Sequence, residues 1–166
     1  KRSKGGLNKF SQPLSYYGKE RKKIEPRKIY CPYFSYLCIM KLTFLGTGTS
    51  QGVPVIGCRC KVCLSEDRRN RRLRTSAMIE LDDVRLVIDA GPDFREQMLR
   101  EGVTHLDAIL LTHEHKDHTG GIDDVRAFNF VDYPTIHTVH IYANERTARS
   151  IRKDFDYAFA ENKYRG

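Results

Sequence analysis

The feature that most constrains this chain is a short apolar run that leads directly into a cluster of metal-binding side chains. Residues 107–111 (DAILL) have the length and continuous hydrophobicity of a strand buried on both faces of a sheet. Residues 113–118 (HEHKDH) then place four metal-binding side chains within six positions. The sequence therefore predicts a buried strand that delivers the chain into a metal site.

The spacing within this cluster predicts a site for two cations. His113 and His115 point the same way if the backbone stays extended, so both imidazoles can reach one cation at the roughly 2.0–2.1 Å of zinc–nitrogen bonds. Asp117 and His118 follow one turn later and offer a carboxylate oxygen and an imidazole to a second cation. Two adjacent cations can share a water and lower its pKa, which would provide a hydroxide nucleophile near neutral pH. The alternative is a histidine-rich surface turn without a ligand role.

Three cysteines form a second group of candidate ligands. Cys58, Cys60 and Cys63 make a C-x-C-x2-C run, and three thiolates can occupy three corners of a tetrahedral zinc site. The run predicts one structural zinc with its fourth ligand elsewhere, and reduced, unligated thiols are the alternative. Because such close thiols are not typical of a secreted disulfide framework, we expect a reducing, cytoplasmic compartment.

The basic charge of the chain is confined to its first segment. Residues 1–39 hold ten Lys and Arg against two Glu, which accounts for the whole net charge of +8. They show neither helical nor strand periodicity, so we interpret them as a disordered or non-native leader, with Met40 as a candidate start of the domain. The charge therefore does not indicate a nucleic acid partner for the domain. Nor does any run approach the ~20 apolar residues of a membrane helix, so no membrane partner is expected.

The pattern of elements from residue 40 onward predicts a mixed sheet, and therefore an α/β or α+β class. Strands are expected at 41–45, 76–81, 84–89, 107–111 and 138–142, the second and third joined as a hairpin. Helices are expected at 92–100, at 121–128 and from an N-cap at 144 to about 155. His105, His137 and His140 stand alone in this pattern and are not predicted to bind metal.

The run 112–121 (THEHKDHTGG) resembles the signature of the metallo-β-lactamase-fold hydrolases, an αββα sandwich of two mixed sheets between helices. The resemblance implies that His113 and His115 bind the first metal and that Asp117 and His118 bind the second. It also implies that Asp117 orients the attacking hydroxide and that Asp89 supports the site from the end of an earlier strand. Two divalent cations are thus expected at the active site, with zinc first and manganese or iron as alternatives.

Further motifs are similar to one branch of this superfamily, which includes the phosphoribosyl cyclic phosphate phosphodiesterases. These motifs are LGTGT at 45–49, VP at 53–54, the three cysteines, RTS at 74–76 and DAGPD at 89–93. The similarity implies a phosphodiesterase that acts on a small phosphodiester. Gly120 and Gly121 would then begin a helix close to the anionic substrate. Arg74 or Arg126 could contact its phosphate, although a structural ion pair is the more common role of such arginines.

The family completes its site with two more histidines and a bridging aspartate from the second half of the fold, and none is identified after His118. Residues 40–166 are therefore expected to form the N-terminal half of the sandwich. Without the second half, these residues by themselves are expected to be an inactive fragment. Several alternatives stay open: a non-catalytic zinc-stabilised binding module, a thioester or lactam hydrolase, and a quinone-cofactor biosynthesis protein on the same fold. A homodimer is also left open.

Overall fold

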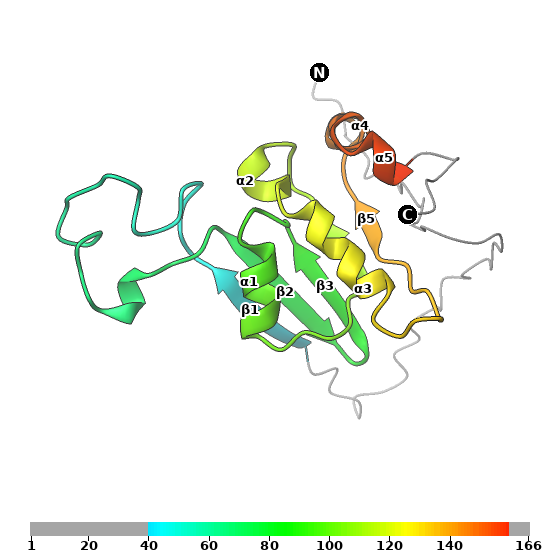
Figure 1. The fold of residues 1–166 in the computed structure, drawn as a ribbon. Helices are drawn as coiled ribbons and strands as arrows, with labels where there is room; N and C mark the ends of the chain where they lie inside the picture. The colour runs from blue at the N-terminus through cyan, green and yellow to red at the C-terminus, as the bar shows by residue number, and fades with distance from the viewer. Residues whose placement is uncertain (1–39, 160–166) are drawn as a thin grey trace, which may run out of the picture.

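The computed structural model describes residues 40–159, which form one mixed sheet with helices packed on one of its faces (Figure 1). The leader predicted at residues 1–39 lies outside these residues. The strands, in spatial order, are β1 (Met40–Gly46), β2 (Ser76–Leu81), β3 (Val84–Ile88), β4 (Ala108–Leu110) and β5 (His140–Tyr142). β1, β2 and β3 are antiparallel neighbours, whereas β4 runs parallel to both β3 and β5. The predicted mixed sheet is confirmed.

The helices lie in most cases where the sequence predicted them. They are α1 (Phe94–Arg100), α2 (Lys116–Thr119), α3 (Arg126–Asn129), α4 (Glu145–Asp154) and α5 (Asp156–Phe159), with 3-10 turns η1 (Arg68–Asn70) and η2 (Ile122–Val125). The predicted cap of α4 is present, because the Asn144 side chain accepts a hydrogen bond from the Thr147 amide at 2.9 Å. None of the helices in residues 40–159 combines the length and the apolar character that a membrane crossing requires.

The helical segment predicted at 121–128 is present, but it is divided into two elements. The structure has the 3-10 turn η2 followed by the short helix α3. Ile122 and Val125 are both buried three residues apart, at 3% and 0% exposure. This spacing matches the three-residue period of a 3-10 turn, so burial of these two side chains favours the tighter winding.

The strand pairing brings two loops to one edge of the sheet. The β2–β3 hairpin turns at Asp82, whose φ of 50° lies in the left-handed region that aspartate tolerates. β3 and β4 run in parallel, so both end at the same edge. The segment after β3 therefore begins beside the segment after β4, and the Asp89 amide donates to the Leu110 carbonyl at 2.9 Å.

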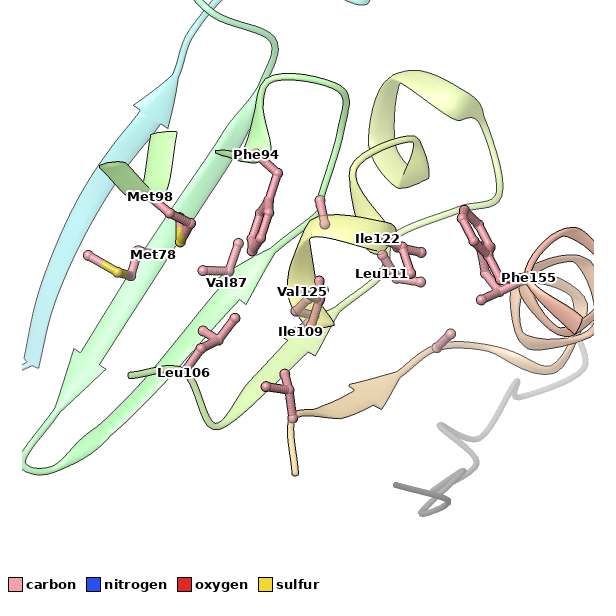
Figure 2. Packing of buried hydrophobic residues seen from close by; sticks show 14 of the residues in the cluster. Met78, Val87, Phe94, Met98, Leu106, Ile109, Leu111, Ile122, Val125 and Phe155 are labelled. Carbon is pink, nitrogen blue, oxygen red and sulfur yellow. The ribbon is translucent and has the colours of Figure 1, made fainter. Parts of the chain in front are cut away.

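The core lies between the sheet and the helices of one face. Figure 2 shows Phe94 and Met98 of α1 together with Ile122 and Val125 of η2 over the strand side chains. The strands contribute Met78, Val87 and Ile109, which are at most 2% exposed. These residues bury the apolar stripes of α1 and η2 and fix both elements on the sheet.

The opposite face of the sheet is also apolar. Met40, Leu42 and Phe44 of β1 are 64%, 50% and 68% exposed, and Val84 of β3 is 44% exposed. By strand register, further apolar side chains lie on the same face: Ala77, Ile79, Leu81, Leu86, Ile88, Ala108 and Leu110. A sheet with two apolar faces is the inner layer of a sandwich, and an αββα fold places a second sheet on this face.

Candidate metal-binding site

The predicted ligands lie on the metal-ligand loop, residues 113–118, which packs against the turn after β3. The Ala90 amide donates to the His118 carbonyl at 2.8 Å, and the Gly121 amide donates to the Ala90 carbonyl at 2.9 Å. A Cβ at Gly91 would overlap the Asp117 carbonyl oxygen, and a Cβ at Gly121 would overlap Gly91. Backbone packs directly on backbone here, which gives Gly121 a structural role, and its predicted place beside a substrate stays a prediction.

Asp89 is the buried centre of the site. Its side chain is 5% exposed and accepts hydrogen bonds from the Thr112 amide at 2.8 Å, the Thr112 hydroxyl at 2.8 Å and His118 Nδ1 at 2.7 Å. A carboxylate can only accept, so Nδ1 of His118 carries the proton. The lone pair of His118 is therefore on Nε2, which is the atom left to bind a cation.

The same aspartate orients a second imidazole through Thr112. His113 Nδ1 lies 2.9 Å from the Thr112 hydroxyl oxygen, whose own proton is donated to Asp89. The hydroxyl must then accept from Nδ1–H of His113, which leaves His113 Nε2 unprotonated as well. One buried carboxylate thus sets the tautomer of two of the predicted ligands.

The structure brings the four predicted active-site ligands together in pairs, although within residues 40–159 only the three cysteines have all their ligand atoms within 4.8 Å of one another. The ring centroid of His113 lies 4.7 Å from that of His115 and 4.0 Å from that of His118. Asp117 Oδ2 lies 3.2 Å from His118 Nε2, so the two atoms that would share the second cation are adjacent. This mixed set of imidazole and carboxylate donors fits zinc, manganese or iron.

His105, His137 and Arg74 each have a carboxylate partner away from the cluster. His105 Nε2 lies 3.0 Å from an Asp107 carboxylate oxygen. Arg74 forms an ion pair with Asp93 at 2.7 Å and donates to the Ser50 carbonyl at 2.9 Å. These contacts give Arg74 the structural role that the sequence favoured.

The three predicted cysteine ligands also come together, with their sulfur atoms within 4.8 Å of one another. The amide of Cys63, followed by the side chain of Cys58, lowers the pKa of Cys60 to about 7. At Cys63 the Val55 amide acts to lower the pKa, but burial and the other two thiols raise it overall. A thiol that ionises near neutral pH is suited to zinc, because the thiolate is the metal ligand.

The cysteine group and the histidine cluster are two separate sites. Figure 1 shows the loop that follows β1, which carries the cysteines, projecting away from the sheet, whereas α2 lies over the sheet edge. A metal ion bound by the three cysteines would therefore order the loop that carries them, as a structural site does.

Three residues beside the ligands had no predicted role. Thr112 connects Asp89 to His113, as described above. Glu114 and Lys116 contact α4 instead of the site. In the sequence, Glu114 and Lys116 are distinguished only by their positions between the ligands. Such positions do not reveal a partner that is distant along the chain.

The comparisons with known proteins agree with this fold. Residues 84–165 match the family described as the Beta-lactamase superfamily domain. These residues therefore belong to a beta-lactamase superfamily domain, and the sheet has the mixed architecture of the metallo-β-lactamase fold. The fold class implied by the resemblance is confirmed.

Individual relatives refine the comparison. The crystal structure of a new diphosphatase from the PhnP family is 48% identical, with a TM-score of 0.67 over 76% of this chain and 50% of that chain. An octanoyltransferase from Porphyromonas gingivalis is 47% identical over 128 residues, which are 76% of this chain and 25% of that protein. Coenzyme PQQ synthesis protein B from Methylobacterium radiotolerans is 33% identical over 101 residues, which are 52% of this chain and 34% of that protein. This chain thus spans half of the solved structure and a quarter to a third of these curated relatives.

Proposed function

We propose that this chain carries part of the active site of a metal-dependent hydrolase that cleaves a small phosphodiester or diphosphate. The observation that supports the proposal best is the Asp89 network, which leaves Nε2 of His113 and His118 unprotonated beside the Asp117 carboxylate. The similarity to a diphosphatase at 48% identity favours cleavage at phosphorus.

In this proposal the residues have distinct roles. His113 and His115 would hold one divalent cation, and Asp117 and His118 a second, while Asp89 fixes the imidazoles. Bound divalent cations would supply an activated water as nucleophile and neutralise phosphate oxygens. Asp117 would orient that water, because its carboxylate lies 3.2 Å from His118 Nε2.

Cys58, Cys60 and Cys63 are proposed to hold a structural zinc apart from the reaction. Their sulfur atoms already lie close enough to share one ion. The role assigned to them is to order their own loop, whose β pairing within residues 40–159 consists of two isolated bridges, Gly48 to Arg74 and Val53 to Arg72.

Acyl transfer, the activity named for the P. gingivalis relative, is less well supported by the site. Covalent acyl transfer uses an activated hydroxyl or thiol nucleophile. The Thr112 hydroxyl beside the cluster is held between the Asp89 carboxylate and His113 Nδ1, where it orients the imidazole. The match moreover spans 25% of that protein.

The proposal is tested by metal analysis together with turnover of bis(4-nitrophenyl) phosphate. His115→Ala should lose the metal of the histidine cluster and any turnover, whereas His105→Ala, which removes a histidine paired with Asp107, should keep both. Metal content is the primary measurement, because the chain spans half of the solved relative. Unchanged metal content and turnover in His115→Ala would contradict the proposal.

A further inference from the structure

The metal-ligand loop is tied to α4 by the two side chains that alternate with its ligands. Glu114 Oε1 lies 2.5 Å from Arg146 Nη2, and Lys116 Nζ lies 2.8 Å from Asp154 Oδ2. Arg146 is the second residue of the ten-residue helix, and Asp154 is its last. The loop is therefore attached close to both ends of α4.

Each attachment has a buried neighbour on or beside α4. The Thr147 hydroxyl, on a residue with 0% exposure, lies 3.5 Å from the second carboxylate oxygen of Glu114. The Lys116 ammonium lies 5.2 Å from the ring centroid of Phe155, which is 7% exposed. Because these neighbours are fixed in the core, they limit how far the two ion pairs can move.

The charges of Arg146 and Asp154 are not explained by the stability of α4 itself. The helix dipole favours negative charge at the N-terminus and positive charge at the C-terminus. Arg146 lies in the first turn and Asp154 at the last position, which is the reverse arrangement. Both side chains instead form ion pairs with the metal-ligand loop: Arg146 with Glu114, and Asp154 with Lys116.

The alternation along the loop connects these ion pairs to the ligands. His115 precedes α2 with extended backbone, at φ −62° and ψ 146°. Glu114 lies between the two histidines at a bend of the chain, and its ion pair holds this bend against α4, which limits how the segment that carries His113 and His115 can turn. The two histidine rings do lie together, with centroids 4.7 Å apart.

We infer that α4 positions the metal-ligand loop and that Glu114 and Lys116 are positioning residues of the metal site. The inference rests on the proposed function, because the orientation of the ligands affects metal binding only if the cluster binds a cation. The side chains of Arg146 and Lys116 are 81% and 62% exposed, so both ion pairs contribute little to the overall stability of the fold. Their effect should therefore be confined to the loop.

The first experiment measures hydrogen exchange in the chain after treatment with a chelator. The double variant Glu114→Gln/Lys116→Met should exchange the amides of His118 and Gly120 several-fold faster than the wild type, because these amides donate within the loop. The urea midpoint should be unchanged. Arg149→Met is the control. It also removes an exposed cation from α4, but the partner of this cation is Glu145 of the same helix and not a residue of the loop. Unchanged exchange in the double variant would overturn the inference.

The second experiment measures Mn²⁺ binding by electron paramagnetic resonance, because imidazole and carboxylate ligands suit this ion better than thiolates do. Glu114→Arg should weaken binding about tenfold or more, in the range found for residues that orient metal ligands. Adding Arg146→Glu restores the ion pair with reversed charges and should recover affinity, which a merely local defect would not allow. No recovery would overturn the inference.

The two experiments separate the inference from the proposed function. If the wild-type chain binds no Mn²⁺, the proposed function fails. The exchange experiment still decides whether Glu114 and Lys116 order the loop.

Discussion

Replacing Asp89 by Asn should weaken metal binding while leaving most of the fold intact. The amide can keep one acceptor oxygen for the Thr112 amide, but its nitrogen must donate where the carboxylate accepted. His118 Nδ1 would then become an acceptor, with its proton moved to Nε2. The Thr112 hydroxyl, released from Asp89, could donate to His113 Nδ1, so both histidines would lose the lone pair on Nε2.

The magnitudes follow from the hydrogen bonds that change. Asp89 accepts three bonds of 2.7 to 2.8 Å. A bond to a charged group contributes about 1.5–3 kcal/mol and a neutral one about 0.5–1.5 kcal/mol, so three such changes should lower the free energy of unfolding by about 3–4.5 kcal/mol. The φ of 61° adds little strain, since asparagine tolerates the left-handed region. Metal affinity should fall about 10–100-fold, as is found for partners that orient ligating histidines.

The assay combines Mn²⁺ titration, urea unfolding with chelator present and imidazole ¹⁵N chemical shifts, which report the tautomer. Asp107→Asn is the matched control: Asp107 also accepts from a histidine, His105 at 3.0 Å, and from a backbone amide, Arg85 at 2.7 Å, but lies at the other end of β4. The control should bind Mn²⁺ like the wild type. Wild-type affinity in Asp89→Asn, or an unchanged His118 tautomer, would refute the reasoning.

The remaining predictions concern the cysteine loop and the turn after β3. In the metal-free chain, alkylation of Cys60 by iodoacetamide should rise with pH around a midpoint of about 7, because the thiolate is the reactive form, and bound zinc should protect it; mass spectrometry of the labelled peptide would show this. A midpoint near the ordinary thiol pKa would contradict the prediction. Gly91→Ala should lower the unfolding free energy by about 1–3 kcal/mol, because its Cβ would overlap the Asp117 carbonyl. An unchanged urea midpoint in Gly91→Ala would contradict the packing argument.

Local signals in the sequence predicted the elements well where a local rule decides them. Strand 76–81 has the predicted bounds, and Asn144 caps α4 as its side chain suggested. The helical segment predicted at 121–128 is present, but its first part is a 3-10 turn, because Ile122 and Val125 are both buried against the sheet. That burial depends on the position of the sheet, which a local pattern does not contain.

The cluster of residues 113–118 was evident from the sequence because its ligands are adjacent in the chain. Metal-binding side chains at such short spacing need only a turn of the right shape to converge, so the residue types and their spacing indicate a site. The same holds for the three cysteines, whose sulfur atoms come together within one loop.

Only the tertiary structure decided how the ligands are oriented. Asp89 reaches His118 across 29 residues because β3 and β4 run in parallel and end side by side. Lys116 meets Asp154 across 38 residues because α4 packs beside the loop. Hydrogen bonds and ion pairs act over a few ångströms in space, whatever the separation along the chain. The types and spacing of the metal ligands could therefore be read from the sequence. The tautomers and directions of these ligands depend on the packing of the strands and of α4.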